Sequence, residues 1–270
     1  IIDQSSSTSP SGSYEGTTSA TQSTGTGTYY VHVQARDEAG NISTIDHAYG
    51  LIENSPSSGS EVMTPLAYTG DGNTSQSIEN SGFLPNLVWF KNRSTSSDHY
   101  LLDDTRGLTN YLLPNATSFE ASDSTLLQSF DVNGFTVGNH PDVNTSGDNY
   151  IGWAFKENSD FMDIVSYSGN SNHGRSIGHD LQATPGLMIL KNTTQNSDWI
   201  VYHENMDNGT SEPFGAPTGP TRWIMNLNNS LNRTHVEGSH FANTTPSSSD
   251  FTLGSHADVN SNGDNFIAYL

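Results

Sequence analysis

The passage FTVGNHPDVNTSGDNYIGW at residues 135–153 decides the fold, because it returns as FTLGSHADVNSNGDNFIAY at residues 251–269. Upstream, LVWFKN at residues 87–92 is matched by LMILKN at residues 187–192. The offset is 116 residues for the first pair and 100 for the second. The second copy therefore carries an insertion, which falls between residues 201 and 249. A repeat of this length predicts two tandem modules of one kind.

Composition restricts the class of protein. The 270 residues include 29 acidic and 9 basic side chains, a formal net charge of −20, and no cysteine. Nucleic-acid binding needs Lys and Arg to replace phosphate counterions, so this balance argues against a nucleic-acid partner and against anionic membrane surfaces. The lack of cysteine excludes disulfides, thiolate metal sites and a cysteine nucleophile. No apolar run approaches the roughly 18 residues of a membrane span, so we expect no membrane insertion.

Short apolar stretches recur between turn residues along both copies. They lie at residues 63–67, 87–90, 100–102, 111–113, 135–137 and 150–155, and again at 162–167, 187–190, 199–202, 222–227, 251–253 and 266–270. Short runs at such spacing predict an all-β chain of tandem antiparallel β-sandwich or jelly-roll modules. We expect at most one helical turn, near residues 122–127.

The N-terminal part has a different character. Residues 30–35 alternate at period two, and residues 42–49 return as a second strand after a turn cluster. The passage GTYYVHVQARDEAGNIST resembles the last hairpin of bacterial immunoglobulin-like or fibronectin-like domains, which implies the C-terminal part of such a sandwich. We therefore expect four parts, namely an immunoglobulin-like part at 1–52, a linker at 53–65, and β-sandwich modules at 66–156 and 157–270. Because the chain begins at Ile1 within a Ser/Thr/Gly-rich stretch, we also expect it to be a piece of a longer protein.

The repeated motifs carry a resemblance to a known family. They are an opening Y-[TS]-G strand, a strand ending in K-N, an F-T-[VL]-G strand and a closing strand that follows G-D-N. Over nearly all of residues 61–270 the chain resembles a domain family of unknown function that is common in structural proteins of marine bacteriophages. The resemblance implies concanavalin-like or jelly-roll sandwiches in tail, fibre or other virion proteins. It implies no catalytic residue.

An acidic turn precedes the closing strand of each copy. The first holds Asp142, Asn144 and Asp148, and the second holds Asp258, Asn260 and Asp264. Oxygen ligands at alternate positions with glycine at the sixth match the first half of an EF-hand loop, which makes these residues a Ca²⁺ hypothesis. The bidentate Glu of the twelfth position is missing. The favoured alternative is a polar turn, because Asn, Asp and Gly tolerate left-handed backbone and cap their own amides.

Two further sets of polar residues suggest chemistry. Asp103 and Asp104 are paired carboxylates beside Arg106, but adjacent strand positions point to opposite faces, so we favour a strand end with a surface ion pair over glycosidase chemistry. The histidines lack the spacing of a shared metal face, and we interpret them as scattered surface and loop residues. This set includes His173, His179, His203, His235, His240 and His256.

The sequence predicts two sets of apolar and aromatic residues, one in the module cores and one in contact with a ligand. The predicted core is Val88, Phe90, Phe135, Val137, Ile151 and Trp153 in the first module, and Ile189, Trp199, Phe251, Leu253, Phe266 and Ala268 in the second. Because Trp223 and His235 lie by the insertion, which a shared scaffold leaves free to vary, we predict glycan contact there.

Together these patterns predict a non-enzymatic structural protein of a virion surface or appendage, such as a tail fibre, capsid fibre or decoration protein. It would present an adhesion surface for host glycans and assemble as a homo-oligomer with other virion subunits. The alternative is a bacterial or archaeal extracellular adhesin or filament subunit with a structural role. Either role places the chain on a virion surface or outside a cell.

Overall fold

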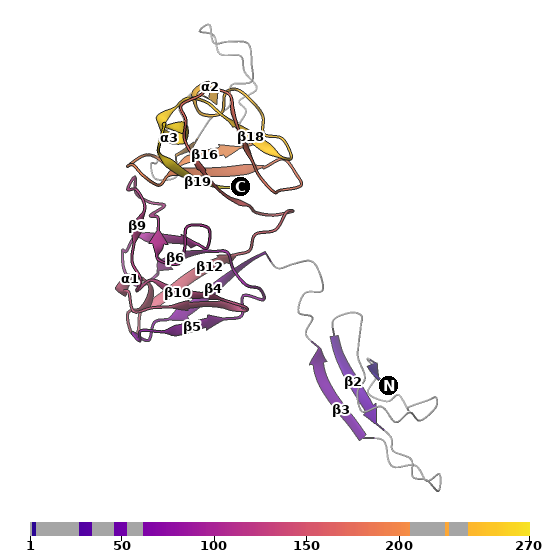
Figure 1. Ribbon diagram of the computed structural model, residues 1–270. Helices are drawn as coiled ribbons and strands as arrows, with labels where there is room; N and C mark the ends of the chain where they lie inside the picture. Colours follow the sequence, from indigo (N-terminus) through magenta and orange to yellow (C-terminus); the bar gives the residue numbers. More distant parts are fainter. Residues whose placement is uncertain (1, 4–26, 34–45, 53–61, 206–224, 227–236) are drawn as a thin grey trace. The chain divides into compact units, whose positions relative to one another are not determined.

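The computed structural model describes residues 2–3, 27–33, 46–52, 62–205, 225–226 and 237–270. The chain divides into two compact units, Ile1–Ser60 and Glu61–Leu270. The described residues form antiparallel sheets with three one-turn helices, so the prediction of an all-β chain is confirmed (Figure 1).

The N-terminal unit contains one three-stranded sheet in the order β1-β2-β3. Its strands are β1 (Ile2–Asp3), β2 (Gly27–Val33) and β3 (Asp46–Ile52). Val31 lies opposite Ala48 in the antiparallel pair β2–β3. The two predicted strands therefore exist and pair with each other, each displaced by a few residues from its expected range. The resemblance to an immunoglobulin-like domain stays a prediction.

The first module of the larger unit consists of two main sheets. The larger sheet has the order β4-β12-β6-β7, with β4 (Met63–Thr69), β12 (Asn149–Phe155), β6 (Leu87–Asn92) and β7 (His99–Asp103). The smaller has the order β10-β11-β5, with β10 (Leu127–Asp131), β11 (Gly134–Val137) and β5 (Gln76–Glu79). The short pair β8 (Asn110–Tyr111) and β9 (Ala121–Ser122) lies beside β7.

The second module repeats this arrangement. Its larger sheet has the order β13-β19-β15-β16-β17, with β13 (Ile164–Ser168), β19 (Asn265–Tyr269), β15 (Leu187–Asn192), β16 (Ile200–His203) and β17 (Met225–Asn226). Its smaller sheet pairs β14 (Arg175–Gly178) with β18 (Asp250–Leu253). Strands β13, β19, β15 and β16 occupy the places of β4, β12, β6 and β7, so the two larger sheets share one strand order.

Each module buries one hydrophobic cluster between its two sheets. In the first, Val88 and Phe90 of β6 pack with Phe135 and Val137 of β11, and all four side chains are fully buried. Gly152 of β12 leaves room for the Phe135 ring, because a Cβ built there would lie 2.6 Å from the ring's Cζ. The alternation predicted from period two therefore holds on the inner faces.

Three predicted core residues are not fully buried. Ile151, Trp153 and Ile189 are half-buried, because they point away from their own module's core. Tyr150, Gly152 and Ala154 face inward on β12 instead, since successive strand residues point to opposite faces. The prediction of full burial for these three is wrong, because they lie on the outer faces of the larger sheets, where they are only partly covered.

The helical turns also differ from the prediction. The segment 122–127 passes from β9 into β10 without a helix. Helix α1 (Pro141–Asn144) and helix α3 (Ala257–Asn260) form instead at the two acidic turns, and α2 (Glu237–His240) precedes β18. His140 and His256 cap α1 and α3, each accepting a backbone N–H at 3.2 Å with its Nδ1.

Candidate functional site: the junction of the two modules

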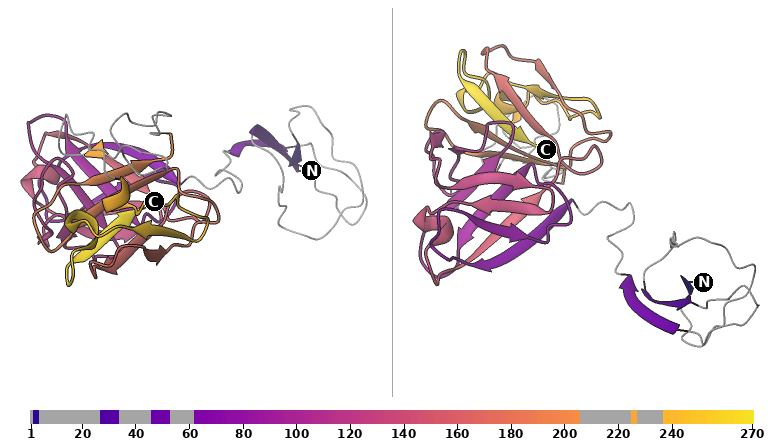
Figure 2. Two further views of the ribbon diagram at one scale, coloured as in Figure 1. Left: turned by 90° about the horizontal axis from the view of Figure 1, so that it is seen from above. Right: turned by 60° about the horizontal axis from the view of Figure 1, so that its bottom comes forward.

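The two larger sheets pack against each other through their outer faces, meaning the faces turned away from each module's own core. A third hydrophobic cluster lies between them, separate from the two module cores. Its buried members are Leu87, Leu101 and Leu112 of the first module and Met162, Ile164, Trp199, Ile267 and Tyr269 of the second. The larger unit is therefore a stack of four sheet layers (Figures 1 and 2).

Trp199 anchors the second module on the first. Its side chain is fully buried, and its indole Nε1 donates hydrogen bonds to the carbonyl oxygens of Leu113 and Ala116, each at 3.1 Å. The adjoining loops also pair through their backbones, because Ser197 N donates to Thr117 O at 2.9 Å. A side chain from one module thus satisfies carbonyl groups of the other.

A buried polar network lies beside this anchor. The Tyr269 hydroxyl donates to Asp103 Oδ2 at 2.7 Å, and Arg106 Nε donates to the same oxygen at 2.7 Å. Arg106 also donates to Glu120 Oε2 at 3.1 Å. Burial lowers the pKa of Arg106, but Tyr269, Asp103 and Glu120 outweigh it, so the pKa lies above its ordinary value. Burial raises the pKa of Tyr269 well above its usual range, and the phenol therefore stays a donor.

The prediction of a surface ion pair at Asp103 and Arg106 is therefore wrong in its placement. Asp103 is fully buried, and the Arg106 side chain is 6% exposed. The second module covers the pair, so the sequence around residue 103 alone gave no sign of burial. Asp104 lies apart from the network, and its Oδ2 accepts a hydrogen bond from Asn86 Nδ2 at 2.8 Å.

Lys191 is a second buried charge at the junction. It has no solvent exposure, and its Nζ donates to Thr117 O at 3.3 Å, Ser197 O at 3.1 Å and Asn192 O at 3.0 Å. Burial lowers its pKa from the ordinary value to about 8, although Asp258 and Asp198 act in the opposite direction. The ammonium thus holds backbone carbonyls of both modules together.

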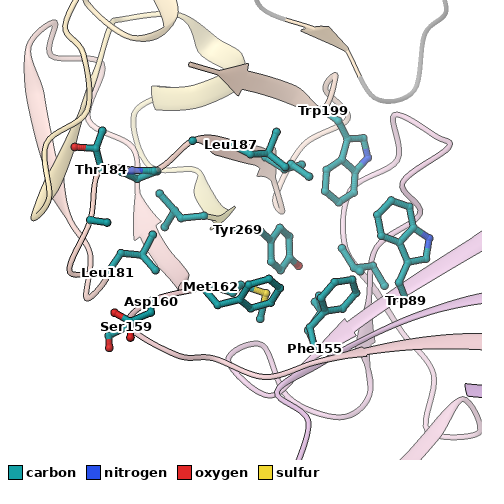
Figure 3. Close-up of a pocket in the computed structure, with 18 residues that line it drawn as sticks. Trp89, Phe155, Ser159, Asp160, Met162, Leu181, Thr184, Leu187, Trp199 and Tyr269 are labelled. Atoms are coloured by element: carbon teal, nitrogen blue, oxygen red, sulfur yellow. The ribbon is translucent and has the colours of Figure 1, made fainter. Parts of the chain in front are cut away.

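An apolar pocket of about 510 Å³ opens within the junction. Figure 3 shows Trp89, Phe155, Trp199 and Tyr269 gathered at one side of it, whereas Ser159, Asp160 and Thr184 lie at the other. Three of these aromatic side chains already have hydrogen-bond partners for their polar atoms. Trp89 Nε1 donates to His99 Nδ1 at 3.0 Å, and Trp199 and Tyr269 donate the bonds described above. The pocket therefore offers ring surface for an apolar group and a small polar rim.

A second cleft at the junction is polar, with a volume of about 490 Å³. It is lined by Arg106 and Glu120 from the first module and by Ser166, Ser168, Thr193 and Asn265, among others, from the second. Hydroxyl, amide and charged groups of this kind suit the hydroxyl groups of a sugar better than an apolar ligand.

The calcium hypothesis falls on the two acidic turns. In the first, Asp142 Oδ2 accepts from the Tyr100 hydroxyl at 2.7 Å, and Asp148 Oδ2 accepts from Asn92 at 3.0 Å. Asn144 is buried, its Oδ1 accepts from Asp71 N at 2.8 Å, and its amide nitrogen donates to Gly138 O at 2.8 Å. These oxygens serve as internal acceptors that close the turn.

The second turn repeats those bonds in part. Asn260 is buried and donates to Gly254 O at 2.7 Å, and Asp264 Oδ2 accepts from Asn192 at 2.9 Å. Asp258 differs, since it lies with His240 and His256. Their potential ligand atoms are within 4.8 Å of one another, although the two histidines are separated by fifteen residues in sequence. Sequence spacing alone therefore missed this cluster.

The remaining predicted contact residues, Trp223 and His235, lie outside the described residues. Among the residues that the structure does describe, no helix is long and apolar enough to cross a membrane.

Comparison with known protein families gives one match. A family model described as a domain of unknown function, DUF7483, matches residues 58–270. This range includes both modules and their junction. Neither the curated proteins nor the solved structures that were compared include a match.

Proposed function

We propose that this chain, which belongs to the DUF7483 family, is a non-enzymatic structural protein of a virion surface or appendage that presents an adhesion surface for host glycans. The observation that carries the proposal is the junction: two sandwich-like modules joined by a shared hydrophobic cluster and by buried polar bonds. A joint that buries charge and indole groups resists bending, because bending would leave those groups unpaired. A fixed orientation between modules suits a rigid spacer that carries load.

The polar cleft supports the adhesive part of the proposal. Ser166, Ser168, Thr193 and Asn265 supply hydroxyl and amide groups, and Arg106 and Glu120 supply charge at one wall. Sugars are recognised by several such neutral donors and acceptors, so glycan binding needs no basic surface. This agrees with the strongly acidic composition, which disfavours phosphate-rich ligands.

A glycan array with the intact chain tests adhesion. Ser168→Tyr should fill the polar cleft and abolish the signal if the cleft binds the sugar. Deletion of residues 210–220 should abolish it instead if the contact lies beside Trp223 and His235. Failure of the intact, folded chain to bind any glycan would refute the adhesive part.

Immunogold labelling of particles and cells from the source tests the structural part. Gold on virion tails, fibres or capsids supports the proposal. Gold on extracellular filaments or the cell wall, with particles unlabelled, would instead support the alternative of an adhesin or filament subunit. Label confined to the cell interior would reject both.

A second candidate function comes from the apolar pocket. Its volume and ring-lined wall suit an acyl chain or an aromatic group with one polar end. A fluorescent fatty acid should bind the intact chain with saturation, and Ile189→Trp, which fills the pocket, should abolish that binding. Val132→Trp is the matched control, because Val132 is 84% exposed and lies outside the pocket. Equal binding by both variants would reject the pocket as the site.

A further inference from the structure

We propose that the second module binds a divalent first-row transition-metal ion, Zn²⁺ foremost, through His240, His256 and Asp258. The potential ligand atoms of the three side chains all lie within 4.8 Å of one another. Two imidazole nitrogens and one carboxylate oxygen form a common three-ligand set for Zn²⁺, with a fourth position left for water. The site is separate from the junction pocket and from the proposed glycan cleft.

The backbone places these residues together by two hydrogen bonds. Gly254 N donates to His240 O at 2.7 Å, and His256 N donates to Ser239 O at 2.8 Å. These bonds hold the end of α2 beside the start of α3. The rings of His240 and His256 consequently stack, with centroids 4.0 Å apart and an interplanar angle of 25°.

Modest side-chain rotation would complete the site. Zn–N and Zn–O bonds of about 2.0–2.2 Å at tetrahedral angles place the ligand atoms roughly 3.3–3.6 Å apart, so the three side chains must move closer together. The His256 side chain is 40% exposed and that of Asp258 is 26% exposed, so both have room to move. His240 is almost fully buried and provides the fixed side of the site.

The first module supplies an internal comparison. His140 and Asp142 stand where His256 and Asp258 stand, but the place of His240 is taken by Leu126, which makes the same backbone bond to Gly138 N. The Tyr100 hydroxyl also donates to Asp142 Oδ2 at 2.7 Å. The second module has Ile200 in the place of Tyr100, since both face the equivalent residue of the neighbouring strand. Two differences, His240 in place of Leu126 and Ile200 in place of Tyr100, thus give the second module a second nitrogen ligand and a carboxylate without the tyrosine bond.

The local charge also suits a cation. Asp258 contributes a carboxylate beside the two imidazole groups. Two imidazole ligands disfavour Ca²⁺, which takes six to eight oxygens, and favour Zn²⁺ or its first-row neighbours.

Isothermal titration of ZnCl₂ into the intact, untagged and chelator-treated chain tests the proposal. We expect one saturable site per chain. His240→Leu installs the residue that the first module already tolerates, and it should weaken Zn²⁺ binding by at least tenfold. His140→Ala, at the equivalent position of the first module, is the matched control and should leave the affinity unchanged. Leu126→His combined with Tyr100→Ile should create a second site.

Circular dichroism establishes that each variant is folded. If His240→Leu is not folded, Asp258→Asn and the anomalous signal of crystals at the zinc edge decide instead. Zinc density on the three side chains supports the proposal. A lack of saturable binding, binding that His240→Leu and Asp258→Asn leave unchanged, or zinc found elsewhere would overturn it.

Discussion

Replacement of Trp199 by alanine tests whether the junction makes one folding unit of the two modules. Trp199 is fully buried within the junction cluster, and its indole nitrogen satisfies the carbonyls of Leu113 and Ala116. Truncation of a buried tryptophan costs about 3–5 kcal/mol, and two carbonyl groups lose their donor in addition. We therefore expect a loss in the upper half of that range. For a unit of this size the melting temperature should fall by roughly 8–20 °C.

The assay is urea unfolding followed by far-UV circular dichroism, because this signal does not depend on the tryptophan that is removed. The unaltered unit should unfold in one transition, whereas Trp199→Ala should either shift that transition or divide it into two. Trp153→Ala is the control, since Trp153 is only half-buried on the outer face of β12 and should cost about half as much. A decrease in the free energy of unfolding of less than about 1 kcal/mol for Trp199→Ala would refute the reasoning, because truncation of a fully buried tryptophan costs more than that.

Three further predictions concern single side chains. Tyr269→Phe removes the donor to the buried carboxylate of Asp103 and should lower the free energy of unfolding by about 1–3 kcal/mol in urea titrations; an unchanged value would show that the network is not coupled to folding. Lys191 has a pKa of about 8 in the folded state, lowered by burial, so between about pH 8 and 10 the unfolded chain binds more protons at this site, and its contribution to stability rises with pH. The urea midpoint of the native chain, measured relative to that of Lys191→Met, should therefore be higher at pH 9.5 than at pH 7. The same difference between the two midpoints at both pH values would contradict the lowered pKa. Gly169→Ala would place a Cβ 1.9 Å from the carbonyl oxygen of Ser261, which forces backbone movement and should cost about 1–3 kcal/mol, whereas Gly174→Ala meets no neighbouring atom and isolates the effect of positive φ.

Much of the architecture is readable from the chain alone. The repeat around Phe135 and Phe251 identifies two modules, since equal patterns of apolar and turn residues demand equal strands. All twelve predicted apolar stretches of the modules contain or overlap a strand. The sequence did not predict strands β5 and β14, although the Ser-Ile pair of each belongs to the repeat. Each has four residues with one buried side chain, which is too short to show an alternation of apolar and polar residues.

The sequence by itself determined the fold class, the two modules and the inner-face residues of β6, β11, β18 and β19, because period two is a local property that each strand carries within itself. Only the tertiary structure decided what covers the outer faces. Trp89 and Ile189 lie in apolar runs, but nothing in those runs says which surface packs against the outer face of the strand. Tertiary packing also decided two contacts between residues that are distant in sequence. The packing of the modules buries Asp103 beside Tyr269, and the packing of α2 against α3 brings His240 to His256.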